Sequence, residues 1–439
     1  AKDQDIDKIW GPPPPADEDG PSREEMRHGL AFSTFATWDD VGKWKDQLRA
    51  KCWVCNDDLK KVAADVTRGL KTPLEKARAL TYFVRRKVRY LSAGERHDYT
   101  PHLPHQVLQN RAGDCKDSSQ LLAVLLREVG IASELATLGT LDDGQIDPKV
   151  PSPWGTHAIL AVTLDGKLHW VDTTARQCRW DELPRDDCDR LTYLTDDKGK
   201  LRLVRTPKLT PESHRTEAVT DVWIDEEGNT RNRRVWTFHG HAALSQRYRY
   251  AEVPEGERRR LMTATLQDAN SRSRLTKLVV DEAALADYEK PVRLEVEFDI
   301  ARQFTGSSER DGSFTDSLVW GRILSHSIDL DRTTAMVLPG PFESVHIYRV
   351  RVPAGWVLDS LGRTREHASK WGTFRAAVKK LDEPGSEGVE IRFETRLHLA
   401  RIEKADLETY RDWYDNVQRD YRSWVTLRPA EKLDAAPRL

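Results

Sequence analysis

The hydrophobic pattern changes its period near the middle of the chain, and this change limits the possible folds more than any other feature. Up to about residue 205, apolar residues recur every three or four positions in some segments and form short continuous runs in others, which indicates helices mixed with buried strands. After Thr206, apolar and charged residues alternate, as in 292–300 and 389–399, and this alternation is typical of strands with one buried face. The sequence therefore predicts an α+β fold whose second half is an antiparallel, sandwich-like β-rich domain.

The same patterns divide the 439 residues into three segments. Residues 1–30 contain Pro12 to Pro15 and a cluster of acidic residues, so we expect a flexible linker or the remnant of an upstream domain. Residues 31–205 form the predicted core, and residues 206–439 form the β-rich region, which could be one domain or two. A helix with a single apolar stripe is expected to end the chain and to pack against one of the domains. The stripe consists of Leu407, Tyr410, Tyr414, Val417, Tyr421 and Trp424.

The composition argues against two classes of partner. Lys and Arg total 69 against 71 for Asp and Glu, so the chain has no overall basic field that would hold nucleic acid or an anionic membrane surface. The longest aliphatic run, Leu121 to Leu126, is much too short to span a bilayer. The chain begins at Ala1 without a basic and then apolar leader, so we expect any targeting signal to lie upstream.

The five cysteines cannot all pair within the chain because their number is odd. Among them, Cys115 follows Gly113 and Asp114 and precedes an apolar helical run that ends before Gly130. We therefore expect Cys115 at or just before the N-terminus of a helix, where unpaired N–H groups and the helix dipole favour a thiolate and could hold an oxyanion. A buried structural cysteine is the alternative, but the polar residues around Cys115 oppose it.

A histidine and an aspartate that could activate this thiol follow on one predicted hairpin. Asp165-Gly166 separates two apolar strands, 157–164 and 168–174, and is a strong signal for a two-residue turn. With these two residues in the turn, His157 and Asp172 become diagonal neighbours on one face of the sheet. The Asp172 carboxylate is then expected to reach the His157 ring.

The motifs at these three positions resemble the transglutaminase-like superfamily. The similarity is greatest to bacterial members in which a β-rich domain of unknown function precedes the core, and it is concentrated in residues 31–200. This chain departs from them in two ways: residues 95–102 stand where relatives tend to be rich in glycine, and only residues 1–30 resemble the tail of the upstream domain. The motifs are Gly113-Asp114-Cys115-Lys116-Asp117, Thr156-His157-Ala158-Ile159 and Trp170-Val171-Asp172-Thr173-Thr174.

The resemblance implies a papain-like core with a catalytic triad. In it, Cys115 is the nucleophile, His157 is the general base and then the acid, and Asp172 orients the imidazole. The implied activity is acyl transfer from a peptide or protein amide, through a thioester, to water or to an amine. A papain-like cysteine peptidase and a non-catalytic binding scaffold are the alternatives. No cofactor and no metal are predicted, and the oligomeric state is left open.

The other four cysteines favour a weaker set of hypotheses. Cys52 and Cys55 form a C-x-x-C pair that could be redox-active, could bind zinc together with Cys178 and Cys188, or could form structural disulfides. Disulfides would favour an oxidising compartment. This is the basis for expecting an extracytoplasmic or periplasmic location, with a cytoplasmic one as the alternative.

Three histidines precede the cysteine motif, at His97, His102 and His105. A metal site that combines them with Cys115 is one interpretation. Surface or substrate-contacting histidines are the more ordinary interpretation, because the predicted hairpin explains more of the sequence.

Overall fold

A computed structural model divides the chain into two compact units, Ala1–Leu209 and Thr210–Leu439. The division lies close to the predicted boundary between residues 205 and 206. The predicted linker at residues 1–30 and the predicted histidine His97 lie outside the described residues. The structure describes residues 32–91, 99–304, 310–314, 328–338, 340–360, 363–381, 387–420 and 423–430.

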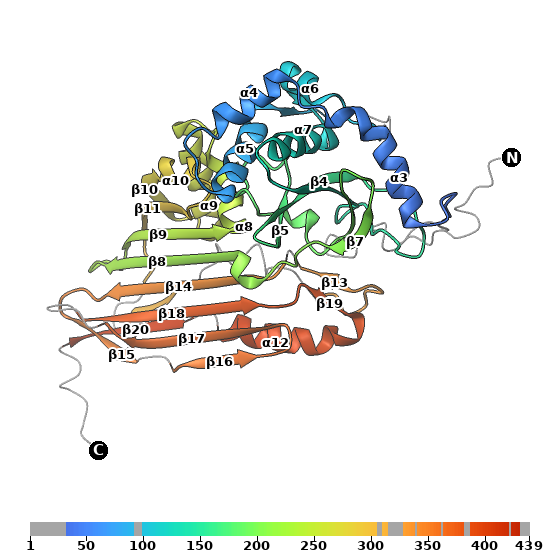
Figure 1. Cartoon of the computed structure of the whole chain (residues 1–439). Coiled ribbons are helices and arrows are strands. Elements are labelled where there is room, and N and C mark those ends of the chain that lie inside the picture. The colour runs from blue at the N-terminus through green and yellow to red at the C-terminus, as the bar shows by residue number, and fades with distance from the viewer. Residues whose placement is uncertain are drawn as a thin grey trace, which may run out of the picture. The chain divides into compact units, whose positions relative to one another are not determined.

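The first unit is built around one buried helix, α7, which spans Cys115–Glu128. Every residue from Asp117 to Leu126 is buried, because helices cover one side of α7 and a sheet covers the other (Figure 1). Gly130 follows the helix with a φ of +78°, a conformation that glycine adopts without strain. The other helices of this unit are α3 (Trp38–Arg49), η1 (Ala50–Trp53), α4 (Asp57–Val66), α5 (Pro73–Lys87), α6 (Pro104–Asn110) and η2 (Arg185–Asp187).

The apolar spacing of residues 73–90, which follows the start signal Thr72-Pro73-Leu74-Glu75, predicts a helix over that range. Helix α5 begins where the sequence predicts and ends earlier. Thr72 and Glu75 form a capping box around Pro73, which confirms the expected start. The predicted end at Tyr90 is wrong: the helix stops at Lys87, and Arg89–Tyr90 forms the short strand β1, which pairs in parallel with β2 (Ala112–Gly113). The backbone of residues 89–90 thus hydrogen-bonds the segment that leads into Cys115.

The sheet of the first unit has five antiparallel strands in the order β5-β4-β3-β6-β7. One face packs against the helices through residues such as Leu160 and Val162. The other face carries a smaller apolar cluster that includes Ile159, Ala161 and Trp170. The strands are β3 (Ser133–Leu138), β4 (His157–Leu164), β5 (Lys167–Val171), β6 (Leu191–Thr195) and β7 (Leu201–Arg205).

The β4–β5 hairpin has the predicted turn and register. Leu164 pairs with Lys167 across Asp165-Gly166, and both turn residues have positive φ, as a tight hairpin turn requires. The prediction that β5 continues to Thr174 is wrong, because the ladder ends at the Leu160–Val171 pair. Asp172 therefore lies just beyond the strand.

The second unit contains an eight-stranded sheet in the order β10-β11-β9-β8-β14-β18-β17-β16. Its neighbouring strands are antiparallel except for β14 and β8, which pair in parallel. The alternation in 292–300 is confirmed, and that in 389–399 is confirmed as far as Leu397, since the apolar residues of β11 and β18 are buried. Its predicted continuation to Leu399 is wrong, because β18 ends at Leu397 and Leu399 is exposed. The strands are β8 (His214–Ile224), β9 (Thr230–Gly240), β10 (Ser273–Val280), β11 (Val292–Ile300), β14 (Phe342–Arg351), β16 (Arg365–Ala368), β17 (Gly372–Lys380) and β18 (Gly388–Leu397).

Two separate cores form on this sheet. Residues of β9, β10 and β11 pack with helices α8 and α9, whereas residues of β14, β17 and β18 pack with α12 and with Leu427 of strand β20 (Figure 1). This layering is the sandwich-like arrangement that the sequence predicts. The remaining elements are η3 (Pro211–Ser213), α8 (His241–Tyr250), α9 (Glu255–Ala269), α10 (Glu282–Ala286), β12 (Arg310–Phe314), β13 (Met336–Val337), β15 (Trp356–Ser360), β19 (Arg401–Ile402), η4 (Lys404–Asp406), α12 (Leu407–Asp420) and β20 (Ser423–Pro429).

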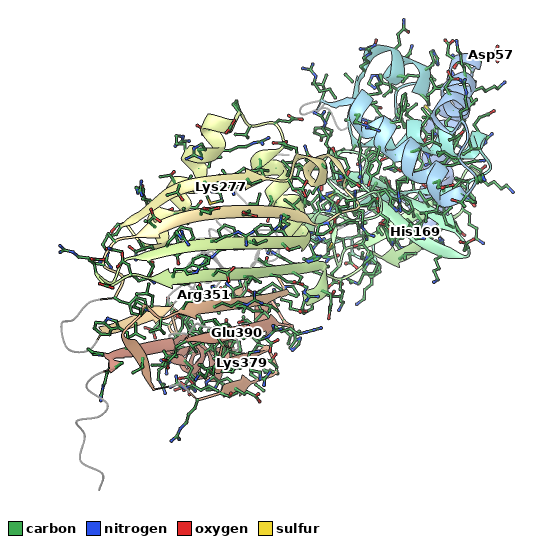
Figure 2. All side chains as sticks on the ribbon, turned by 90° about the vertical axis from the view of Figure 1, so that its left-hand side faces the viewer. Asp57, His169, Lys277, Arg351, Lys379 and Glu390 are labelled. Atoms are coloured by element: carbon green, nitrogen blue, oxygen red, sulfur yellow. The ribbon has the colours of Figure 1, made fainter. Side chains whose placement is uncertain are left out.

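Charged pairs cover parts of the sheet that the cores leave open. The Nζ atom of Lys379 lies 3.1 Å from Oε1 of Glu390 on the neighbouring strand (Figure 2). Lys277 Nζ makes a similar contact with Glu297 Oε1, also at 3.1 Å. Cross-strand pairs of opposite charge stabilise a sheet modestly and keep its open face polar.

The predicted terminal helix is confirmed over α12, where Tyr410 and Val417 are fully buried. Its predicted extension to Trp424 is wrong. The backbone of 423–429 forms β20, which pairs with both β12 and β15, so hydrogen bonds in a sheet replace a further helical turn. Tyr421 lies outside the described residues.

None of the described helices is both long and apolar enough to cross a membrane.

Candidate active site

Cys115 is the first residue of α7, as the sequence predicts. Asp114 is the N-cap: its carboxylate accepts a hydrogen bond from the amide of Asp117 (3.1 Å), and Asp117 accepts one from the amide of Asp114 (3.1 Å). This capping box fixes the start of the helix. The amides of Cys115 and Lys116 belong to the first turn and so have no acceptor within the helix.

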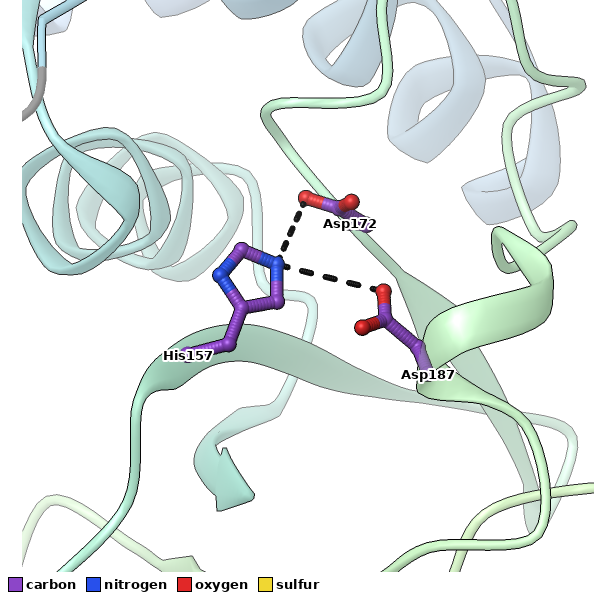
Figure 3. A group of neighbouring side chains, drawn as sticks. All are labelled: His157, Asp172 and Asp187. Atoms are coloured by element: carbon purple, nitrogen blue, oxygen red, sulfur yellow. Dashed lines mark ion pairs between the residues drawn. The ribbon is translucent and has the colours of Figure 1, made fainter. Parts of the chain in front are cut away.

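His157 and Asp172 lie together, as the hairpin register predicts. His157 begins β4, and its Nε2 atom lies 3.4 Å from Oδ1 of Asp172 (Figure 3). The same Oδ1 accepts hydrogen bonds from the amide and the hydroxyl of Thr174, at 2.8 and 2.7 Å. Thr174 therefore holds the Asp172 carboxylate in place after the strand has ended.

The two groups stabilise each other's charged forms. Burial disfavours the imidazolium of His157, but the charge and hydrogen bond of Asp172 outweigh burial and raise the His157 pKa well above its ordinary value. Burial likewise opposes the Asp172 carboxylate, yet His157 and Thr174 lower its pKa to about 2. The structure therefore favours a charged His157–Asp172 pair over a wide range of pH.

Cys115 lies near the His157 side chain and contributes to the raised pKa of the imidazole. The Nε2 atom faces the carboxylates, and the other ring nitrogen, Nδ1, points away from them (Figure 3). The ring can thus exchange a proton with Cys115 at Nδ1 while Asp172 contacts Nε2. The structure brings together all three residues that the sequence singles out.

Asp187 is a fourth residue of the site, which the sequence did not predict. It lies in η2 and is almost fully buried, and its Oδ2 atom is 3.9 Å from His157 Nε2. Burial raises the pKa of Asp187 to about 7, against the attraction of His157 and with the help of the nearby Asp172 carboxylate. No motif marks Asp187, because only the fold brings its loop to the β4–β5 hairpin.

Ligand atoms of His157, Asp172 and Asp187 lie within 4.8 Å of one another, which is the residue set of a small metal site. Among the described residues this is the sole group of its kind. The Asp172 oxygen that faces the ring already accepts two hydrogen bonds from Thr174. That arrangement suits a residue that orients an imidazole better than a free metal ligand.

Two buried side chains join the segments that carry the site. Arg85 of α5 donates from Nε to the carbonyl of Asp172 (2.9 Å) and from Nη1 to the carbonyl of Cys178 (2.8 Å). Ser119, one turn after Cys115, donates to the carbonyl of Ala158 at 3.2 Å. Its Oγ atom also lies 3.1 Å from the Thr173 hydroxyl. These contacts fix helix α7 and the residues around Asp172 relative to β4.

The other cysteines lack the surroundings of Cys115. All five are free thiols, so the structure contains none of the expected disulfides. Burial raises the pKa of Cys52 and Cys178, and it raises the pKa of Cys55 to about 11 and of Cys188 to about 12. Within the described residues these four do not gather into a zinc site.

The histidines that precede the cysteine motif do not gather around Cys115 either. His102 Nδ1 lies 3.0 Å from Asp117 Oδ2, and the His102 amide donates to Asp117 Oδ1 at 2.8 Å. His102 therefore belongs to the structure around the capping box. Of the three, His102 and His105 fall within the described chain, and neither is part of a cluster of metal-binding side chains.

Residues 60–175 match the sequence profile of the transglutaminase-like superfamily. The chain contains a transglutaminase-like core. This confirms the resemblance found in the sequence, and the matched range includes Cys115, His157 and Asp172. No curated protein matches the chain.

Solved structures extend the comparison beyond the transglutaminase-like core. A protein from Parabacteroides distasonis, described as a candidate protease, aligns with 92% of this chain at a TM-score of 0.54 and 14% sequence identity. This chain spans 63% of that protein's length. A candidate cysteine protease from Cytophaga hutchinsonii, with 19% identity, aligns with 34% of this chain and 47% of its own, at a TM-score of 0.23. At such low identity the first similarity shows the fold, and the fold class expected from the sequence is confirmed.

Proposed function

We propose that this protein is a cysteine-dependent acyl-transfer enzyme that acts on a peptide or protein amide. The observation that carries the proposal is the position of one imidazole, that of His157, near Cys115 and 3.4 Å from the Asp172 carboxylate. The superfamily match and the geometry together support a papain-like cysteine enzyme. The description of the Parabacteroides distasonis structure as a candidate protease agrees with such chemistry.

In the proposed reaction, the Cys115 thiolate attacks the carbonyl carbon of the amide and a C–S bond forms. The positive end of the α7 dipole favours the thiolate, and the free amides at the start of α7 are placed to stabilise the oxyanion. The imidazolium of His157 gives its proton to the leaving amine as the C–N bond breaks. His157 then takes a proton from water or from a second amine, which attacks the thioester and releases Cys115.

We assign Asp172 and Asp187 different roles on the opposite side of the ring. Asp172 stays ionised and orients His157, because its pKa is about 2. Asp187, with a pKa raised to about 7 by burial, carries a proton below that pH and is then uncharged beside the Asp172 carboxylate. Asp187 is thus a positioning residue that keeps a second negative charge away from the ring at acidic pH.

The choice between hydrolysis and transfer to an amine depends on the acceptor, since both use the same three residues. The protein is incubated with a peptide library, with and without a primary amine, and the mass changes are read. Cleavage alone indicates a peptidase, whereas amine-dependent adducts indicate a transferase. Either product must be lost in Cys115→Ala. If the wild type forms neither, the non-catalytic scaffold becomes the better account.

The extracytoplasmic location remains a prediction. The cysteine argument behind it has no support in the structure, because all five cysteines are free thiols.

A further inference from the structure

A lysine of α3, Lys45, lies near enough to the proposed nucleophile for their charges to interact, and it has no carboxylate partner among the described residues. The Nζ atom of Lys45 stands over the rings of Tyr99 and Tyr193, 4.8 and 5.5 Å from their centroids. Within the described chain, no carboxylate forms an ion pair with Lys45 and no hydrogen bond reaches its ammonium group. Aromatic faces attract a cation but do not neutralise it.

The aromatic rings around Lys45 are themselves held in place. Tyr193 is buried, and its hydroxyl donates to the carbonyl of Pro153 at 2.7 Å. Trp38 packs on Tyr193 with centroids 5.7 Å apart, and Trp44 packs edge-on against Tyr99 at 5.2 Å. The lysine is therefore confined between fixed rings, in contrast to an ordinary surface lysine, which is free to move through solvent.

Two further cations, Arg49 and Lys116, act on Lys45. Burial, and then Arg49, lower the pKa of Lys45 to about 7; Lys116 acts in the same direction, whereas Cys115 opposes them. Two of these cations are already engaged: Lys116 pairs with Asp114, and Arg49 donates to the carbonyl of Asp196 at 3.2 Å. Of these three cations, Lys45 has neither an ion pair nor a hydrogen bond within the described residues.

We propose that Lys45 binds a carboxylate of the substrate beside Cys115, so that the enzyme acts on amides that carry a free carboxylate near the scissile bond. This inference rests on the proposed function, because it assumes that the substrate carbonyl approaches Cys115. A bound carboxylate supplies the missing anion, and the rigid rings preorganise the ammonium group to receive it.

Two alkylating reagents of nearly equal size test the proposal without a known substrate. Iodoacetate carries a carboxylate and iodoacetamide does not, and each reacts when the Cys115 sulfur displaces iodide and forms a C–S bond. Site-resolved mass spectrometry at pH 6 gives the rate constant of each reagent at Cys115. The ratio of iodoacetate to iodoacetamide cancels differences in the intrinsic reactivity of the thiol, so it reports on charge near the sulfur.

The ratio is expected to fall about fivefold or more in Lys45→Met and in Lys45→Gln, because one positive charge near the carboxylate is removed. Lys43→Met is the matched control, because Lys43 lies on the same helix and is exposed; its ratio should equal that of the wild type. An unchanged ratio in both Lys45 variants would overturn the proposal. The iodoacetamide rate checks that each variant is folded around Cys115.

The same data separate the proposed catalytic role of Cys115 from the proposed carboxylate site at Lys45. If Cys115 reacts slowly with both reagents in the wild type, the proposed catalytic role is contradicted. The ratio is still measurable in that case, and it still decides whether Lys45 attracts a carboxylate.

Discussion

Arg85 of α5 donates a hydrogen bond from Nε to the main-chain carbonyl of Asp172, at 2.9 Å. Its Nη1 atom also reaches the carbonyls of Cys178 and Arg179, at 2.8 and 3.1 Å. One fully buried guanidinium therefore holds the loop on which the proposed orienting residue lies. This loop has left the sheet after Val171, so its position depends on Arg85 and not on strand pairing.

Replacing Arg85 by Met should destabilise the protein and weaken the site. The change leaves buried carbonyls without a donor, which costs about 2–4 kcal/mol of the free energy of unfolding. Urea unfolding measures this loss. The neighbouring Arg86 is exposed, so Arg86→Met is the control and should change stability by about 0.5 kcal/mol or less. Equal stability of the two variants would contradict the role assigned to Arg85.

Gly113→Ala should disturb the start of α7. A Cβ atom at this position would lie 2.8 Å from the Cβ of Asp117 and 3.2 Å from Cγ1 of Val107. The capping box must shift to accept it, and we expect a loss of about 1–3 kcal/mol, with slower alkylation of Cys115. Thermal unfolding and iodoacetamide labelling measure the two effects.

Gly256→Ala is the matched control for this substitution. Gly256 lies in α9, and a Cβ atom added at this residue would meet no neighbouring atom within 4 Å. Alanine should therefore be neutral there or stabilise the helix by up to about 1 kcal/mol. A Gly113→Ala protein as stable as this control would show that the tight contact at the motif is unimportant.

The free energy of unfolding should depend on pH because of the raised pKa of Asp187. Its pKa in the folded protein is about 7, above the ordinary value of 3.8, so the folded state holds a proton that the unfolded state has lost between these values. The stabilisation of the folded state by this bound proton is therefore fully present below pH 4 and is lost as the pH rises to about 7. Asp187→Asn should gain stability relative to the wild type between pH 4 and 8, on the order of 3 kcal/mol.

Urea unfolding of the wild type and Asp187→Asn at several pH values makes this comparison. The exposed acid Asp57 provides the control, and Asp57→Asn should follow the wild-type curve. If the difference between the wild type and Asp187→Asn is constant with pH, Asp187 does not hold a proton in the folded protein.

Local signals account for the parts of the site that the sequence predicted. The cap at Asp114 and the turn at Asp165-Gly166 depend on residues close together in the chain, and the turn fixes the hairpin register across which His157 meets Asp172. The same holds for the alternating strands of the second unit. Such features follow from short-range geometry, so a single sequence suffices to predict them.

Packing between distant segments accounts for what the sequence did not predict. Arg85 and Asp187 reach the site only because α5 and η2 pack against the β4–β5 hairpin. The parallel pairing of β8 with β14 joins segments more than a hundred residues apart. No local pattern at these residues distinguishes them from ordinary buried or surface positions.

The central claim, that His157 activates Cys115, is tested most directly by the alkylation of Cys115 with iodoacetamide at pH 6 in the wild type and in His157→Ala, with Cys188 as an internal reference. We predict that Cys115 reacts at least about tenfold faster in the wild type than in His157→Ala, because the imidazolium stabilises the thiolate, whereas Cys188 is unaffected. Equal rates at Cys115 in the two proteins would contradict the account.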